Sequence, residues 1–329
     1  MLIRECVEKM KQAAAPEMAA SEGRVRNEAL RGIASALRRE AETVFAANAR
    51  DLEAFDAAGG APALRKRLLF NKAKLGDCVA GLLQLAELPD PLGRVTLERE
   101  LDEGLLLSRI SCPIGVIGVI FEARPDALVQ ISSLCLKSGN CAVLKGGKET
   151  ANTNRALFEV IYEAALAAGL PEGCLALAEQ HSEIDELLTC DREVDLIIPR
   201  GSNAFVRYIM DHTRIPVMGH ADGICHIYVD KDADQDKAIR VILDAKTQYT
   251  AACNAVETVL TDRAIAGEFL PKLKAAFDGA GVKMRGTAEV SAIVPCEVMG
   301  EEDFAAEYLD LIASVKLLDG VEEAVRHIN

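Results

Sequence analysis

The sequence contains no tryptophan, and aromatic residues make up only 4% of its 329 positions. Half of the residues are apolar, so burial must come mainly from alanine, valine, leucine and isoleucine. Parallel sheets flanked by alanine-rich helices are usually built from these residues. The composition therefore favours an α/β protein, and the length favours two domains.

The sequence also lacks the patterns of a membrane or metal protein. It has no apolar run of membrane-spanning length and no recognisable signal peptide, and its ten cysteines form neither a C-x-x-C pair nor a compact zinc spacing. The histidines are dispersed as well, so we expect no metal. Reduced cysteines in the cytoplasm fit this pattern best.

Basic residues are too few for a nucleic-acid scaffold. The formal net charge of -14 argues against binding to nucleic acid and against an anionic membrane surface. A small anionic substrate remains possible, because it needs only a local cluster of donors.

Two types of organisation follow each other along the chain. Residues up to 88 have the pattern of consecutive amphipathic helices, with Ala29, Leu30, Ile33, Ala34 and Leu37 on one face. Residues 95–101 and 105–110 flank an Asp-Glu-Gly turn and predict a hairpin, which we expect to pair with another subunit. After Pro113, short apolar strands alternate with helices, which predicts a doubly wound parallel sheet.

Two predicted strand ends open onto glycine-containing segments that could hold phosphates. Residues 144–150 carry two lysines and two glycines, and residues 199–203 read Pro-Arg-Gly-Ser-Asn before a helix. Helix N-termini offer free backbone donors, and glycine allows a pyrophosphate to approach closely. Neither segment is a full G-x-G-x-x-G, so a solvated turn remains the alternative for each alone. Together they favour a nucleotide.

One cysteine lies where a nucleophile could work. Cys253 has small neighbours and follows a predicted helix (236–246) and precedes a predicted strand (256–260). Functional groups concentrate at such junctions, although a free cysteine is more often a buried apolar residue.

Two further residues are candidates for substrate binding. His220 could activate a thiol as a general base, or be a hydrogen-bonded interdomain histidine. Arg124 follows the first buried strand and suits a carboxylate or an acyl phosphate, with a surface salt bridge as the alternative. His226, within a strand pattern, is better explained as structural.

The segments 113–116, 121–125, 144–148, 199–202 and 252–258 together resemble the gamma-glutamyl phosphate reductase family of the aldehyde dehydrogenase superfamily, over essentially the whole chain. The resemblance implies an aldehyde dehydrogenase-like fold and reduction of L-glutamyl 5-phosphate by NADPH to L-glutamate 5-semialdehyde, a step of proline biosynthesis. It implies that Cys253 is the catalytic thiol that forms a thioester, with Asn254 orienting it or donating to the substrate. It assigns cofactor binding to the following residues: Lys145, Lys148, Gly201, Ser202 and Glu307.

Several positions set the chain apart from hydrolytic aldehyde dehydrogenases. Ala123 stands where those enzymes carry an oxyanion asparagine, and His220 stands where they carry a general-base glutamate. Both fit exchange of the thioester with phosphate, with backbone N–H groups near Cys253 stabilising the oxyanion. Lys148 stands where NAD-preferring relatives often carry a glutamate, which favours NADP.

The resemblance also implies a domain plan. We expect residues 1–94 and 114–224 to form the NADP-binding domain, 95–113 an oligomerisation hairpin and 225–329 the catalytic domain. Family members continue past the position of Asn329 into a segment with F-G-L-G-A-E and H-A-R-G-P motifs, so we expect the catalytic domain of this sequence to be incomplete. A nucleotide-binding remnant without turnover and a hydrolytic aldehyde dehydrogenase remain alternatives.

Overall fold

The computed structural model describes residues 3–60, 62–122, 124–180, 182–201, 203–219, 223–250 and 252–329. The chain divides into two compact units, Met1–His220 and Ala221–Asn329. Each unit has its own hydrophobic core.

The first unit begins with the helical region that the apolar periodicity predicts. Its helices are α1 (Ile3–Lys9), α2 (Ala15–Ala20), α3 (Gly23–Arg39), α4 (Ala41–Ala57), α5 (Pro62–Leu68) and α6 (Lys72–Glu87). The predicted face of α3 is buried, from Ala29 to Leu37. This confirms the helical reading of the region.

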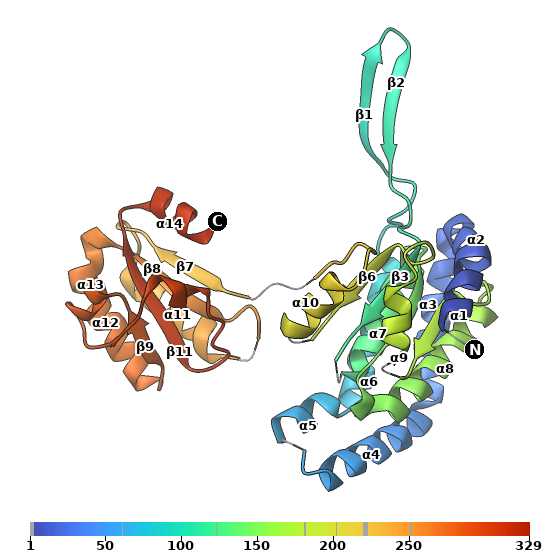
Figure 1. The fold of residues 1–329 in the computed structure, drawn as a ribbon, viewed down its shortest axis with the longest axis horizontal. Helices are drawn as coiled ribbons and strands as arrows, with labels where there is room; N and C mark the ends of the chain where they lie inside the picture. Colours follow the sequence, from blue (N-terminus) through green and yellow to red (C-terminus); the bar gives the residue numbers. More distant parts are fainter. Residues whose placement is uncertain are drawn as a thin grey trace. The chain divides into compact units, whose positions relative to one another are not determined.

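A long hairpin projects from the first unit (Figure 1). Its strands, β1 (Val95–Asp102) and β2 (Leu105–Ile110), pair antiparallel around a turn in which Gly104 has a φ of 72°. Every residue of both strands is exposed. Several of these residues are large and apolar. Both faces of the hairpin therefore expose apolar surface of the kind that marks interaction sites.

A four-stranded parallel sheet forms the centre of the first unit. Its order is β5-β4-β3-β6, with strands β3 (Val116–Ile120), β4 (Cys141–Lys145), β5 (Leu175–Ala178) and β6 (Leu196–Pro199). The connecting helices are α7 (Pro125–Lys137), α8 (Ala151–Ala167) and α9 (Ser182–Leu188), and α10 (Asn203–Asp211) follows β6. The chain adds strands on one side of β3 and then returns to its other side. In open α/β sheets, ligands bind where the strand order reverses in this way, which here is at the carboxyl ends of β3 and β6.

Strand β3 begins two residues later than the apolar run in the sequence predicts. Ile114 is 53% exposed and lies outside β3, which begins at Val116. Gly115 has a φ of 127°, and a Cβ there would overlap the Asp195 carboxylate, which accepts a hydrogen bond from the Val116 N–H at 2.8 Å. The glycine therefore ends the irregular segment and lets the strand begin.

The second unit contains a five-stranded parallel sheet of order β10-β9-β11-β8-β7. Its strands are β7 (Cys225–Val229), β8 (Val256–Asp262), β9 (Lys283–Gly286), β10 (Glu297–Val298) and β11 (Ile312–Leu318). Its helices are α11 (Gln235–Thr247), α12 (Ala266–Gly279), α13 (Ala288–Ser291) and α14 (Val321–Ile328). The two parallel sheets confirm the α/β prediction. Within the described residues, no helix has both the length and the apolar character required to cross a membrane.

Candidate functional site

The carboxyl ends of three neighbouring strands in the first unit are joined to one another. The Phe121 N–H donates to the Lys145 carbonyl at 2.9 Å, and the Arg200 N–H donates to the Ile120 carbonyl at 2.7 Å. The segments that follow β3, β4 and β6 therefore meet at one edge of the sheet. Ligands of open α/β sheets bind at this edge.

Lys145 is the last residue of β4 and its side chain is buried, at 7% exposure. Its Nζ donates to the Gly146 carbonyl at 2.7 Å, the one side-chain hydrogen bond it makes to a described residue. Burial lowers the pKa of this amine, although the carboxylates of Glu183, Glu149 and Glu179 oppose the shift. An ammonium has three donors, so two remain available for a ligand.

Gly146 leaves room that any other residue would fill. A Cβ at this position would overlap the side-chain amide of Asn154 and lie 3.0 Å from the Phe121 ring. Asn154 is 3% exposed; its Nδ2 donates to Thr150 Oγ1 at 3.0 Å, whereas its Oδ1 has no partner in the described part of the chain. Since amide orientation is assigned from such partners, this position offers one unsatisfied polar atom beside Lys145. A glycine cradle, a buried cation and an unpaired acceptor fit a ribose of a dinucleotide.

The other two phosphate candidates lie at helix starts. Lys148 begins the 3-10 helix η2 (Lys148–Thr150), and its side chain is exposed, with no hydrogen bond to a described residue. Gly201 lies two residues before α10, and a Cβ there would come 2.9 Å from the Phe205 ring. A larger residue at this position would press on the Phe205 ring. Ser202 lies outside the described residues.

Arg124 forms a surface salt bridge, the alternative to anion binding that the sequence left open. Its Nη2 lies 3.3 Å from Asp126 Oδ2, while Lys74 approaches the other carboxylate oxygen at 3.4 Å. The guanidinium is 61% exposed, so the pair contributes little to stability. Arg124 has five donors, and most of them remain free for an anion. Ala123 lies outside the described residues.

In the second unit, Cys253 and Asn254 occupy the two central positions of a turn. The Ala255 N–H donates to the Ala252 carbonyl at 2.9 Å and closes the turn. The turn lies between α11 and β8, which confirms the predicted junction, and both side chains are exposed. Cys253 is therefore not a packed core thiol.

The backbone around this turn has free donors and a close neighbour. The N–H groups of Cys253 and Asn254 have no hydrogen-bond partner in the described part of the chain. Gly223 lies against the turn, because a Cβ there would overlap the Cys253 carbonyl oxygen. Substitution of Gly223 would push the turn away. His220 lies outside the described residues.

Cys225 and two carboxylates share the neighbourhood of the turn. The Cys225 Sγ donates to the Cys253 carbonyl at 3.5 Å. Burial raises the pKa of the Cys225 thiol, and electrostatic interaction with Cys253, Glu257 and Glu307 adds to the shift. Cys225 therefore lies within electrostatic range of both Cys253 and Glu307.

Sequence reasoning missed a buried ion pair behind Cys253. Lys246 of α11 and Glu257 of β8 lie 2.8 Å apart, with side chains 0% and 1% exposed. The signal was present, because Glu257 interrupts the apolar run from Ala255 to Leu260, and glutamate is almost never buried unless paired. Its partner could not be read from the sequence.

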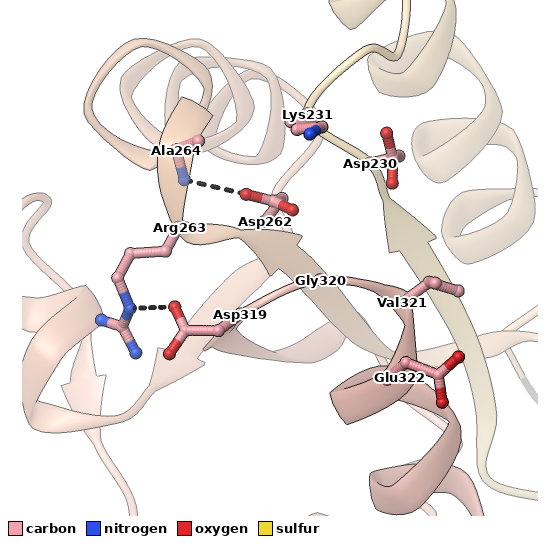
Figure 2. Close-up of a pocket in the computed structure, with 9 residues that line it drawn as sticks. All are labelled: Asp230, Lys231, Asp262, Arg263, Ala264, Asp319, Gly320, Val321 and Glu322. Atoms are coloured by element: carbon pink, nitrogen blue, oxygen red, sulfur yellow. Dashed lines mark hydrogen bonds and ion pairs between the residues drawn. The ribbon is translucent and has the colours of Figure 1, made fainter.

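A pocket lies at the other end of the same strands (Figure 2). Asp230 follows β7, Asp262 ends β8 and Asp319 follows β11, so the pocket lies at the carboxyl edge of the sheet. Cys253 precedes β8 and lies at the amino edge. The seven residues of β8 separate the two by roughly 20 Å. This pocket is therefore distinct from the thiol site.

Comparison with known proteins gives a consistent result. The model of the aldehyde dehydrogenase family matches residues 2–295. Gamma-glutamyl phosphate reductase of Ruminiclostridium cellulolyticum is 52% identical over 96% of this chain and 73% of its own length. The corresponding protein of Acetivibrio thermocellus is 50% identical over 100% of the chain and 76% of its own length. The crystal structure of gamma-glutamyl phosphate reductase from Thermotoga maritima has a TM-score of 0.93 and 34% identity, over 98% of this chain and 79% of that one.

Proposed function

The chain belongs to the gamma-glutamyl phosphate reductases, within the aldehyde dehydrogenase family, and we propose that it reduces L-glutamyl 5-phosphate to L-glutamate 5-semialdehyde in proline biosynthesis. NADPH supplies the hydride, and the products are the aldehyde, inorganic phosphate and NADP⁺. The observation that carries the proposal is the exposed thiol of Cys253 at the centre of a turn with two free backbone donors.

Cys253 performs the covalent step in this proposal. Its thiolate attacks the acyl carbon, forming a C–S bond while the C–O bond to phosphate breaks and phosphate leaves. The thioester carbon then accepts a hydride, and the resulting hemithioacetal breaks its C–S bond to release the aldehyde and the thiolate. Small neighbours leave room for the acyl chain.

Backbone groups stabilise the negative charge that develops on the carbonyl oxygen. The N–H groups of Cys253 and Asn254 lie next to the reacting sulfur in the chain and have no hydrogen-bond partner among the described residues. Fixed donors of this kind stabilise a transition state by about 2.7–4 kcal/mol each in well-studied enzymes. The side chain of Asn254 is exposed beside them and serves as an additional donor.

The cofactor-binding residues of this proposal are those that the family resemblance assigns. Lys145 and the cradle at Gly146 bind the adenosine ribose, and Lys148 pairs with a 2′-phosphate, which favours NADP over NAD. Gly201 and Ser202, which precede α10 in the sequence, bind the pyrophosphate. Glu307 binds the nicotinamide ribose.

Arg124 is our candidate for the substrate anion. Its free donors suit the α-carboxylate or the phosphate of the substrate. We retain His220 as a second substrate-binding candidate, on its sequence position alone.

The decisive experiment is the reverse reaction. Purified protein is given glutamate 5-semialdehyde, NADP⁺ and inorganic phosphate, and NADPH formation is followed by absorbance. We expect turnover that requires phosphate and is lost in Cys253→Ala, while Cys296→Ala, a half-buried cysteine of the same unit, keeps it. Turnover without phosphate would instead identify a hydrolytic aldehyde dehydrogenase. Cofactor binding without turnover would identify a nucleotide-binding remnant.

A further inference from the structure

Burying the charges of Lys246 and Glu257 carries a large desolvation penalty. Taking both charges out of water costs several kcal/mol per ion, and apolar residues of similar volume are often as stable. The pair lies at 2.8 Å with both side chains inaccessible to solvent. Stability alone therefore gives a weak reason for charges at these two positions.

The second oxygen of Glu257 reaches a strained backbone position. Glu257 Oε1 accepts a hydrogen bond from the Leu309 N–H at 3.3 Å. Leu309 has a φ of 52°, the one left-handed residue other than glycine in the described part of the chain. Such a conformation is strained and persists only when surrounding contacts fix it. The Leu309 side chain is 45% exposed, so its own burial does not supply those contacts.

The hydrogen bond between Glu257 and Leu309 joins the chain beside Cys253 to the chain beside Glu307. Glu257 lies four residues after Cys253 and is the second residue of β8. Leu309 lies two residues after Glu307. The segment around Glu307 is also held by Tyr308, whose hydroxyl contacts Ser314 Oγ at 2.8 Å. Glu257 connects this segment directly to the strand that follows the thiol.

We propose that Glu257 is a positioning residue: Lys246 holds its carboxylate in place, and its second oxygen sets the Glu307 segment relative to the Cys253 turn. This inference rests on the proposed function for its effect on the cofactor. The carboxylate itself touches no reacting atom. Its loss therefore acts on cofactor binding through the backbone at Leu309.

Two double variants separate this role from the stability of the core. Lys246→Met with Glu257→Gln removes both charges but keeps an oxygen that can accept from Leu309. Lys246→Met with Glu257→Leu removes both charges and the acceptor. We expect the two proteins to melt within a few degrees of each other, because both replace an ion pair by neutral groups of similar volume.

The KM for NADP⁺ and the rate of amide hydrogen exchange then test whether Glu257 positions the Glu307 segment. We expect the Gln variant to keep a KM for NADP⁺ within about threefold of the parent, and the Leu variant to raise it about tenfold or more, with faster hydrogen exchange in the peptide 307–310. The exposed pair Lys272 and Glu268 of α12 provides the control, because Lys272→Met with Glu268→Gln should change neither quantity. Equal KM and equal exchange in the two double variants would overturn the proposal, as would losses that simply follow the melting temperature.

A second pair of variants leaves the core untouched. Leu309→Pro removes the donor and cannot adopt a positive φ, whereas Leu309→Gly keeps the donor and adopts it without strain. We expect the Pro variant to behave like the Glu257→Leu protein and the Gly variant like the parent; identical KM values would contradict the role of this hydrogen bond. If the parent chain shows no phosphate-dependent turnover, the proposed function fails, and the exchange comparison still decides the role of Glu257.

Discussion

The imidazole rings of His226 and His327 meet edge to face, with centroids 5.3 Å apart. His226 belongs to β7 and His327 to α14, so the contact helps to join the last helix to the edge of the second sheet. Lys316 adds a positive charge, with its Nζ 3.4 Å from His327 Nδ1. A second proton in this cluster would place like charges side by side.

The histidine cluster predicts how stability depends on pH. Burial lowers the pKa of both histidines below 6.5, and for His327 the charges of Lys316 and His226 lower it further, while Glu301 and Glu323 oppose the shift. The unfolded chain therefore binds more protons than the folded one below about pH 6.5, and stability falls as the pH falls through this range. Because both side chains are only half-buried, we expect at most about 1 kcal/mol per histidine.

Urea unfolding of the second unit at pH 7.5, 6.5 and 5.5 measures this effect. The loss between pH 7.5 and 5.5 should be smaller in His327→Gln than in the parent. His212→Gln, an exposed histidine of the first unit, serves as the control. A parent and His327→Gln protein with the same pH dependence would refute the prediction.

Cysteine reactivity should separate the site thiol from the core thiols. Burial raises the pKa of Cys78, Cys135 and Cys174 to about 12, and the thiolate is the reactive form. Cys253 is exposed. We expect iodoacetamide at pH 7.5 to modify Cys253 at least about a hundredfold faster than these three, as read by peptide mass spectrometry over time.

The labelling has an internal control. Cys112 is also exposed, and it follows the hairpin strand β2 in the first unit. Addition of NADP⁺ should change labelling of Cys253 and leave Cys112 unchanged. Rapid labelling of the three core cysteines in the folded protein would contradict the prediction that burial protects their thiols.

Lys148 gives a test of cofactor preference. Lys148→Glu replaces an exposed cation by an anion, which repels a 2′-phosphate but can accept hydrogen bonds from ribose hydroxyls. We expect the ratio of NADP to NAD affinity to fall about tenfold or more, since a hydrogen bond between charged groups contributes about 1.5–3 kcal/mol. Titration with both cofactors measures the ratio.

The control for Lys148 is Lys231→Glu, which makes the same charge change beside the pocket of Figure 2. It should leave the ratio unchanged. An unchanged ratio in Lys148→Glu as well would remove this lysine from the cofactor site.

The sequence predicted the elements of the fold better than the contacts between them. Continuous apolar runs marked β3, β4 and β6, and small residues around Cys253 marked the junction before β8, because both signals are local. The start of β3 was missed by two residues, since Gly115 and Asp195 meet only in the folded chain. The contact of Glu257 with Leu309 joins residues 52 positions apart. No local pattern encodes such a contact.

The hairpin offers a test of self-association, which we propose from its exposed apolar residues. Leu106 is 59% exposed on β2, and the free edges of an exposed hairpin can add strands from another copy. Leu106→Asp should leave the melting temperature nearly unchanged, because little of this side chain is buried within the unit. Light scattering should then show a smaller assembly than that of the parent protein, as a charge on this face is costly to desolvate in an interface. The matched control is Leu134→Asp on α7, where the replaced leucine is 57% exposed. If both variants keep the parental mass at every concentration, the hairpin does not hold copies together, and its apolar faces need another explanation.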